Sequence, residues 1–99
     1  MRVWVNGKSW DLSFVGRIGS SRGSTTLGLC EHVGGKHRRI RVLRRLQGQE
    51  RLRILLHELL HAALWDLSEE TVDTVSTDLA EILYQKLGYR SPEDPSDPV

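Results

Sequence analysis

The chain has 99 residues, 38% of them hydrophobic, which suits one domain with a small core. No apolar run approaches the ~18–20 residues that a membrane helix needs, and the first residues do not have the character of a signal peptide. The single cysteine, Cys30, cannot form an internal disulfide, so we expect a reducing, cytoplasmic setting.

The net charge of +1 hides an uneven distribution. Residues 1–53 contain 12 Lys or Arg and 3 Asp or Glu, whereas residues 54–99 contain 2 and 10. Eight of the basic residues lie in the segment Lys36–Arg53, and such a cluster can bind nucleic acid. The interpretation that we favour is simpler: the basic half neutralises the acidic half within one fold.

Residues 2–15 predict a β-hairpin. The stretches RVWV and KSWDLSFV alternate apolar and polar residues, and Asn6-Gly7 between them is a strong signal for a two-residue turn. That turn would place Val3 opposite Trp10, a favourable cross-strand pair.

A loop rich in Gly, Ser and Thr then leads to a second predicted hairpin. Its strands, LGLCEHV and KHRRIRVL, flank Gly34-Gly35, which we interpret as another two-residue turn. In that register the core-facing side carries Leu27, Leu29, Ile40 and Val42. The other side carries Cys30, His32, His37, Arg39 and Arg41. We interpret His32 and His37, which would face each other, as a surface pair rather than a second metal site, and Cys30 as a small apolar filler.

Two helices are expected to follow. Residues 49–65 contain good helix formers and neither proline nor glycine, and their leucines form one broad stripe that leaves His57 and His61 on another side. Ser68 should cap a second helix, which ends at Gly88. Its expected buried stripe comprises Val72, Val75, Leu79, Ile82, Leu83 and Leu87. A link of about two residues makes the helices antiparallel.

The predicted fold class is therefore α+β. Two N-terminal β-hairpins form a small antiparallel sheet, packed on a C-terminal antiparallel helical hairpin, and both helices are expected to cover one face of the sheet. This single domain spans residues 1–90. The acidic, proline-rich tail over residues 91–99 is predicted to be disordered.

The first helix contains HELLH, which fits the motif H-E-x-x-H. Residues four apart project side by side from a helix, so His57 and His61 can meet one zinc ion at Zn–N distances of about 2.0–2.1 Å. Glu58 points about 100° away from His57, where it can take a proton from a water that zinc acidifies. The predicted reaction is hydrolysis of a peptide bond, and the alternative is an ordinary helix with two exposed histidines.

A hydrolytic zinc site usually has three protein ligands and one open position. No histidine follows His61, so a third ligand on that side must be a carboxylate. The helical hairpin brings residues 73–78 level with the histidines. We rank the candidates Asp73, then Glu69, then Asp78, and for each the alternative is a solvated helix charge. The predicted site comprises the base Glu58 and the zinc ligands His57, His61 and Asp73.

The stretch GLCEH…GKHRRIRVLRRLQGQERLRILLHELLHAALWDL resembles the core of minimal zincins, in which a Gly-x-Cys strand and an I-x-V strand precede the H-E-x-x-H helix. SprT-like metallopeptidase domains share that order. The closer resemblance, over residues 27–90, is to short phage and prophage proteins in which a DLSEE-x-V-D helix follows the motif. The resemblance implies zinc on His57 and His61, with Glu58 as catalytic base. It favours an acidic residue at Asp73, whereas SprT-like proteins use a downstream histidine that this chain lacks.

We therefore predict a cytoplasmic zinc metallopeptidase (host cytoplasm if phage-encoded) that acts on a peptide or protein substrate and has no membrane partner. The alternative is a nucleic-acid-binding or phage interaction module with a structural or vestigial metal site. SprT-like relatives act on DNA-associated proteins, and the segment Lys36–Arg53 is where nucleic acid would bind. The sequence selects neither Tyr84 nor Tyr89 as an oxyanion stabiliser, and it leaves the oligomeric state open.

Overall fold

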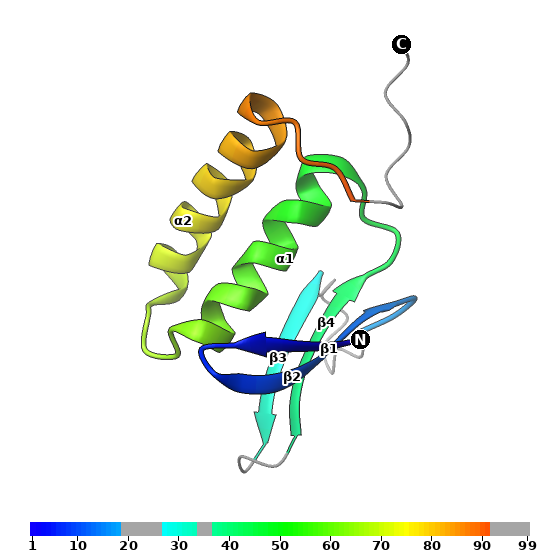
Figure 1. Ribbon diagram of the computed structural model, residues 1–99, viewed down its shortest axis with the longest axis vertical. Helices are drawn as coiled ribbons and strands as arrows, with labels where there is room; N and C mark the ends of the chain where they lie inside the picture. The colour runs from blue at the N-terminus through cyan, green and yellow to red at the C-terminus, as the bar shows by residue number, and fades with distance from the viewer. Residues whose placement is uncertain (19–26, 34–36, 92–99) are drawn as a thin grey trace.

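The computed structural model describes residues 1–18, 27–33 and 37–91. It confirms the α+β class (Figure 1). In chain order, the elements are β1 (Arg2–Val5), β2 (Lys8–Val15), β3 (Gly28–Val33), β4 (His37–Leu43), α1 (Gly48–Ala63), α2 (Glu69–Glu81) and the π-helical turn η1 (Ile82–Lys86). No helix in these ranges is long and apolar enough to cross a membrane.

The acidic tail was predicted to be disordered over residues 91–99. Its residues 92–99 lie outside the described part of the chain.

The four strands form one mixed sheet in the order β1-β2-β4-β3. Each hairpin is antiparallel, but β2 and β4 pair in parallel, so the expectation of a wholly antiparallel sheet is wrong. The reason is that β4, not β3, occupies the place beside β2. The connection between Val15 and Gly28 is long enough to cross two strand spacings of about 4.8 Å each, which puts β3 at the far edge.

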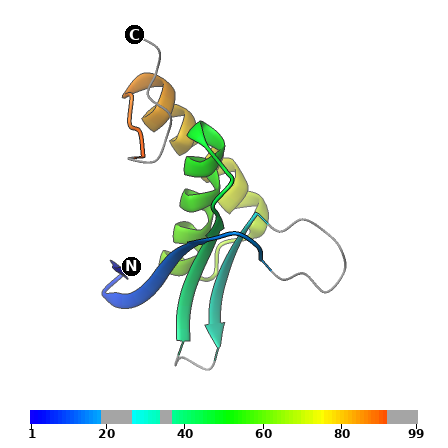
Figure 2. The same ribbon diagram turned by 90° about the vertical axis from the view of Figure 1, so that its right-hand side faces the viewer.

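The first hairpin has the predicted register. Val3 lies opposite Trp10, and both Asn6 (φ 50°) and Gly7 (φ 74°) have the positive φ that a type I′ turn requires. The side-chain amide of Asn6 donates a hydrogen bond of 3.2 Å to the carbonyl of Ala63. The turn is therefore tied to the C-terminal end of α1, toward which the hairpin curls (Figure 2).

The second hairpin is shifted by one residue from its predicted register. Cys30 lies opposite Ile40, and Leu29 lies opposite Arg41. The strands are separated by the three residues 34–36, not by two. Because side chains alternate along a strand, a shift of one residue transfers each of them to the other face. Cys30 therefore shares the core face with Ile40, and Leu29 does not.

The same shift separates the two histidines that were expected to face each other. The backbone register pairs His32 with Arg38 and Val33 with His37. In this register the two histidines are not cross-strand partners, as the predicted two-residue turn would have made them.

Helix α1 lies between the strands and α2 (Figure 1). It contacts β1, β3 and β4, and its Ile54 joins a core around the fully buried Ile40 and Val42. Among the described residues, α2 contacts α1 and η1 but no strand. The expectation that both helices cover the sheet is therefore wrong for α2.

Helix α2 starts where predicted, and the helical segment made of α2 and η1 ends just before Gly88, as predicted. The backbone N–H of Thr71 donates to the Ser68 hydroxyl at 3.1 Å, and Gly88 has a φ of 73°. The link between the helices spans residues 64–68, longer than the two expected. The predicted buried stripe is wrong at its end: Ile82 and Leu87 are 48% and 62% exposed. The wider π turn after Glu81 changes the phase of the helix, and the buried positions of α2 are Val72, Ser76 and Ala80.

Candidate metal centre

Two helices bring three potential ligands to one point. The Nε2 atoms of His57 and His61, one turn apart on α1, are 3.1 Å from each other. The Glu69 carboxylate, in the first turn of α2, reaches both rings: Oε1 is 2.8 Å from Nε2 of His57, and Oε2 is 2.8 Å from Nε2 of His61. One ligand atom from each residue lies within 4.8 Å of the others.

Asp73 lies on the other side of the His57 ring. Its Oδ1 is 3.0 Å from Nδ1 of His57, although the ring N–H is not aligned with it for a hydrogen bond. Asp73 was the first choice as third ligand, and Glu69 the second; the structure brings Glu69, not Asp73, to the two Nε2 atoms. Asp78, the third choice, is exposed, and it is not among the residues that line this site.

The position of the turn explains why the ranking changed. The contacts His57–Asp73 and His61–Glu69 both have residue 65 as their midpoint, whereas the sequence argument placed the midpoint near 67. A two-residue shift in the midpoint moves the matching position on α2 by four residues. That is about one helical turn, the separation between Asp73 and Glu69.

The donor set fits a zinc ion. Two imidazole nitrogens and a carboxylate oxygen are common zinc ligands, and bonds of about 2.0–2.1 Å at tetrahedral angles separate such atoms by roughly 3.3 Å. The observed 2.8–3.1 Å is slightly closer. The Glu69 side chain is 70% exposed, so it can move outward by the small amount required.

The hydrogen-bond geometry of His57 marks the same point. Its Nε2 lies 2.8 Å from Oε1 of Glu69 with hydrogen-bond geometry, whereas Nδ1 has no hydrogen-bond partner among the described residues. A proton on Nε2 therefore lies where the cation would sit, and binding of a cation there would displace it.

Glu58 lies beside these ligands and is 7% exposed. Its Oε1 is 3.8 Å from Nε2 of His57. Burial raises the pKa of Glu58 to about 7; Glu69 adds to the increase, and His57 opposes it. The carboxyl group is therefore set to exchange a proton near neutral pH.

Strand β3 forms the wall against which Glu58 rests. A Cβ atom on Gly28 would lie 2.7 Å from Cγ2 of Ile54 and 3.0 Å from Cγ of Glu58, so only glycine fits there. Cys30 is the next residue on that face, and burial, followed by the charge of Glu58, raises the pKa of its thiol to about 12. The thiol is therefore neutral, which agrees with its interpretation as a small filler.

These walls enclose a cleft of about 460 Å³. It is lined by Gly28, Leu29, Cys30, His57, Glu58, His61, Trp65, Leu67 and Glu69. Sequence reasoning gave no site role to Gly28, Trp65 or Leu67. The available signal for Gly28 was a glycine inside a predicted strand, because such a glycine often marks a place where another part of the protein or a ligand comes close to the backbone. The local pattern gave no such signal for Trp65 and Leu67.

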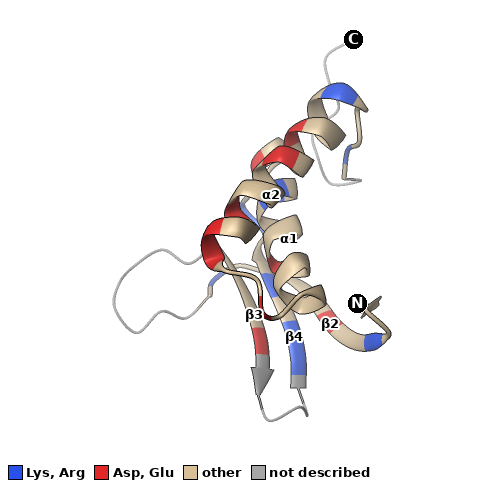
Figure 3. Cartoon of the chain, turned by 90° about the vertical axis from the view of Figure 1, so that its left-hand side faces the viewer, with Lys and Arg blue, Asp and Glu red and all other residues tan. Residues whose placement is uncertain are grey.

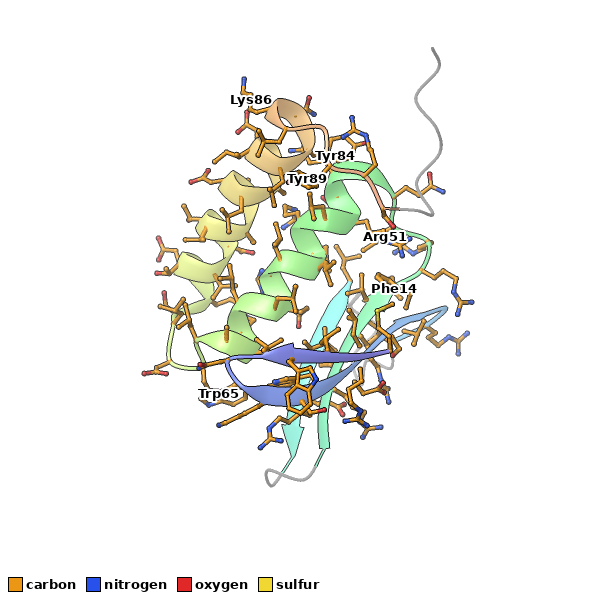
Figure 4. The ribbon with its side chains drawn as sticks, in the orientation of Figure 1. Phe14, Arg51, Trp65, Tyr84, Lys86 and Tyr89 are labelled. Carbon is orange, nitrogen blue, oxygen red and sulfur yellow. The ribbon has the colours of Figure 1, made fainter. Side chains whose placement is uncertain are left out.

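The two tyrosines considered as oxyanion stabilisers lie elsewhere. Tyr84 and Tyr89 line a second pocket with Phe14 and Arg51, at the opposite end of α1 from Trp65 (Figure 4). Arg51 is buried, and its guanidinium lies 3.9 Å from the centre of the Phe14 ring. Neither tyrosine lines the cleft that contains the ligand cluster.

The basic segment Lys36–Arg53 runs along β4 and into the start of α1. Figure 3 shows basic residues on the strands and acidic residues gathered on α2. Arg39 lies 3.3 Å from Glu31, and Arg53 donates two hydrogen bonds to Glu50. Two arginines of the basic segment, Arg39 and Arg53, therefore already contact acidic groups within the protein.

No protein-family model, curated protein or solved structure matches the chain. The resemblance to minimal zincins therefore stays a prediction from the sequence motif alone. The fold and site define a small α+β protein with a candidate His-His-Glu metal centre at one end of a helical hairpin.

Proposed function

We propose that the protein is a zinc-dependent metallopeptidase, with Glu58 as general base. The observation that carries the proposal is the convergence of His57, His61 and Glu69 on one point, beside a buried carboxyl group. The proposal revises the predicted ligand set, because Glu69 replaces Asp73.

Each side chain has a separate task in this proposal. His57, His61 and Glu69 hold the ion, which when bound supplies Lewis acidity that lowers the pKa of water and polarises a carbonyl group. Asp73 positions His57: after a small rotation of its exposed side chain it accepts a hydrogen bond from Nδ1, which directs the lone pair of Nε2 to the metal.

Glu58 moves the proton. A base is most effective when its pKa lies close to the working pH. Burial raises the pKa of Glu58 to about 7 in the metal-free protein, and the charge of a bound cation would lower it from that value. In a peptide hydrolysis, the Glu58 carboxylate takes a proton from the attacking water and later gives it to the amine that leaves. Its burial against Gly28 limits the positions that the carboxyl group can adopt.

Nucleic-acid binding stays a prediction from the sequence. In the described part of the segment Lys36–Arg53, Arg39 and Arg53 contact acidic groups of the protein itself. A reducing, cytoplasmic setting belongs to the proposal as well, because Cys30 has no second cysteine to pair with.

The test uses purified protein that is stripped of metal, reloaded with zinc and mixed with an unfolded, dye-quenched protein substrate. We expect about one zinc per chain and cleavage by the wild type. Glu58→Gln should keep the zinc and lose activity by about a thousandfold. The matched control is Glu70→Gln, an exposed position on α2 that does not line the cleft, and it should behave as wild type. Absence of tight zinc binding, or equal cleavage by Glu58→Gln, would contradict the proposal.

A further inference from the structure

One exposed aromatic side chain lies in the cleft beside the ligand cluster. Several large hydrophobic side chains are exposed elsewhere on the described surface, among them Trp4, Ile82 and Leu87. Trp65 is 61% exposed and lines the same cleft as His57 and Glu58. The indole lies at the end of α1, where the link to α2 begins (Figure 4).

The backbone around Trp65 is held from both sides. The N–H of Leu64 donates to the carbonyl of Leu60 at 2.8 Å, and the N–H of Leu67 donates to the carbonyl of Leu64 at 3.1 Å. The capped start of α2 follows at Ser68. The backbone that carries Trp65 is therefore fixed, and an indole has only two side-chain torsions to order. It offers contact area at a low entropic cost.

Three of the polar side chains in the cleft contact one another, because the carboxylate of Glu69 reaches the rings of His57 and His61. Among the described residues, no Lys or Arg lines the cleft. The surface that is left for a ligand side chain comes from Cys30, Trp65 and Leu67, beside the strand position of Leu29. Such a lining favours an apolar side chain, and the nearby carboxylates disfavour an acidic one.

We infer that the cleft selects peptides with a bulky apolar side chain, such as leucine or phenylalanine, next to the bond to be cleaved. Trp65 is the residue that recognises this side chain. The inference rests on the proposed peptidase function and adds the class of substrate.

Binding without turnover gives the most direct test. Zinc-loaded Glu58→Gln is titrated by calorimetry with blocked peptides that are identical except at one central position, which is Leu, Phe, Ala, Lys or Asp. We expect the Leu and Phe peptides to bind about tenfold more tightly than the Ala peptide, and the Asp peptide to bind most weakly. Adding Trp65→Ala should remove the difference between Leu and Ala.

The matched control is Trp4→Ala in the same background. Trp4 is 71% exposed but does not line the cleft, so the preference for Leu should persist. Equal binding of all five peptides, tighter binding of the Lys or Asp peptide, or an unchanged preference in Trp65→Ala would overturn the inference.

The outcome also separates this inference from the function on which it rests. If the wild type cleaves the five peptides at equal rates, the peptidase function stands and only the selection by Trp65 fails. If the zinc-loaded wild type cleaves no peptide and Glu58→Gln binds none, both fail.

Discussion

The two walls of the cleft are built in different ways. The helical wall takes its ligands from residues close in sequence: His57 and His61 are one turn apart, and Glu69 follows after a short link. The strand wall comes from β3, where Gly28 and Cys30 approach the same helix from far upstream. The comparison teaches that local helix geometry aligns the two histidines and the turn between the helices selects the carboxylate that joins them, whereas long-range packing sets the environment of the base.

The largest expected effect is on the helical wall. Glu69→Ala should weaken zinc binding by at least a hundredfold, about 3 kcal/mol, because one of three ligands is lost. Competition with a chromophoric chelator measures this affinity. Asp78→Ala, on the same helix but outside the site, is the matched control and should leave it unchanged. A larger loss in Asp73→Ala than in Glu69→Ala would restore the ligand set predicted from the sequence.

The second prediction concerns Glu58, where the two walls meet. In the metal-free protein its pKa is about 7, against an ordinary 4.5. Between these values the folded protein keeps a proton that the unfolded chain releases. The contribution of Glu58 to the free energy of unfolding is therefore fully present below pH 4.5. It is lost as the pH rises to 7, a change on the order of 3 kcal/mol.

Urea unfolding of the metal-free protein at a series of pH values measures this slope. Glu58→Gln cannot titrate, so the difference between the two proteins isolates the contribution of Glu58 from that of the histidines. A difference that stays constant between pH 4.5 and 7 would refute the assigned pKa.

The third prediction tests the strand wall. Gly28→Ala should lower the free energy of unfolding by about 2 kcal/mol, because Ile54 and Glu58 must move away from the new methyl group. Zinc affinity should change little, since the ligands lie on the helices, but peptidase activity should fall as Glu58 is displaced. Gly16→Ala is the matched control, because a Cβ there meets no atom within 4 Å. Equal stability of the two variants would show that the contact at Gly28 is not restrictive.

The smallest expected effect is that of Asp73→Ala. Loss of a carboxylate that orients a metal-bound histidine should weaken zinc binding by about tenfold, less than the loss of Glu69. Asp73→Asn keeps an acceptor oxygen and should recover part of the affinity. Identical affinities for Asp73→Ala and wild type would remove Asp73 from the site.

Several features were predictable from the sequence because their causes are local. Asn6-Gly7 tolerates positive φ and sets the first register, Ser68 caps α2, and the spacing of His57 and His61 follows from 3.6 residues per turn. The α+β class follows from the order of these elements. No long-range contact is needed to derive any of them.

Other features were decided by the tertiary structure. A Gly-Gly pair suits loops of two or three residues, so only packing against α1 could place Cys30 on the core face. The parallel pairing of β2 with β4 joins strands that are separated in the sequence by β3. The choice between Glu69 and Asp73 depends on a turn whose midpoint moves by two residues. In each case the local sequence permits two arrangements, and the packing of the elements against one another selects one of them.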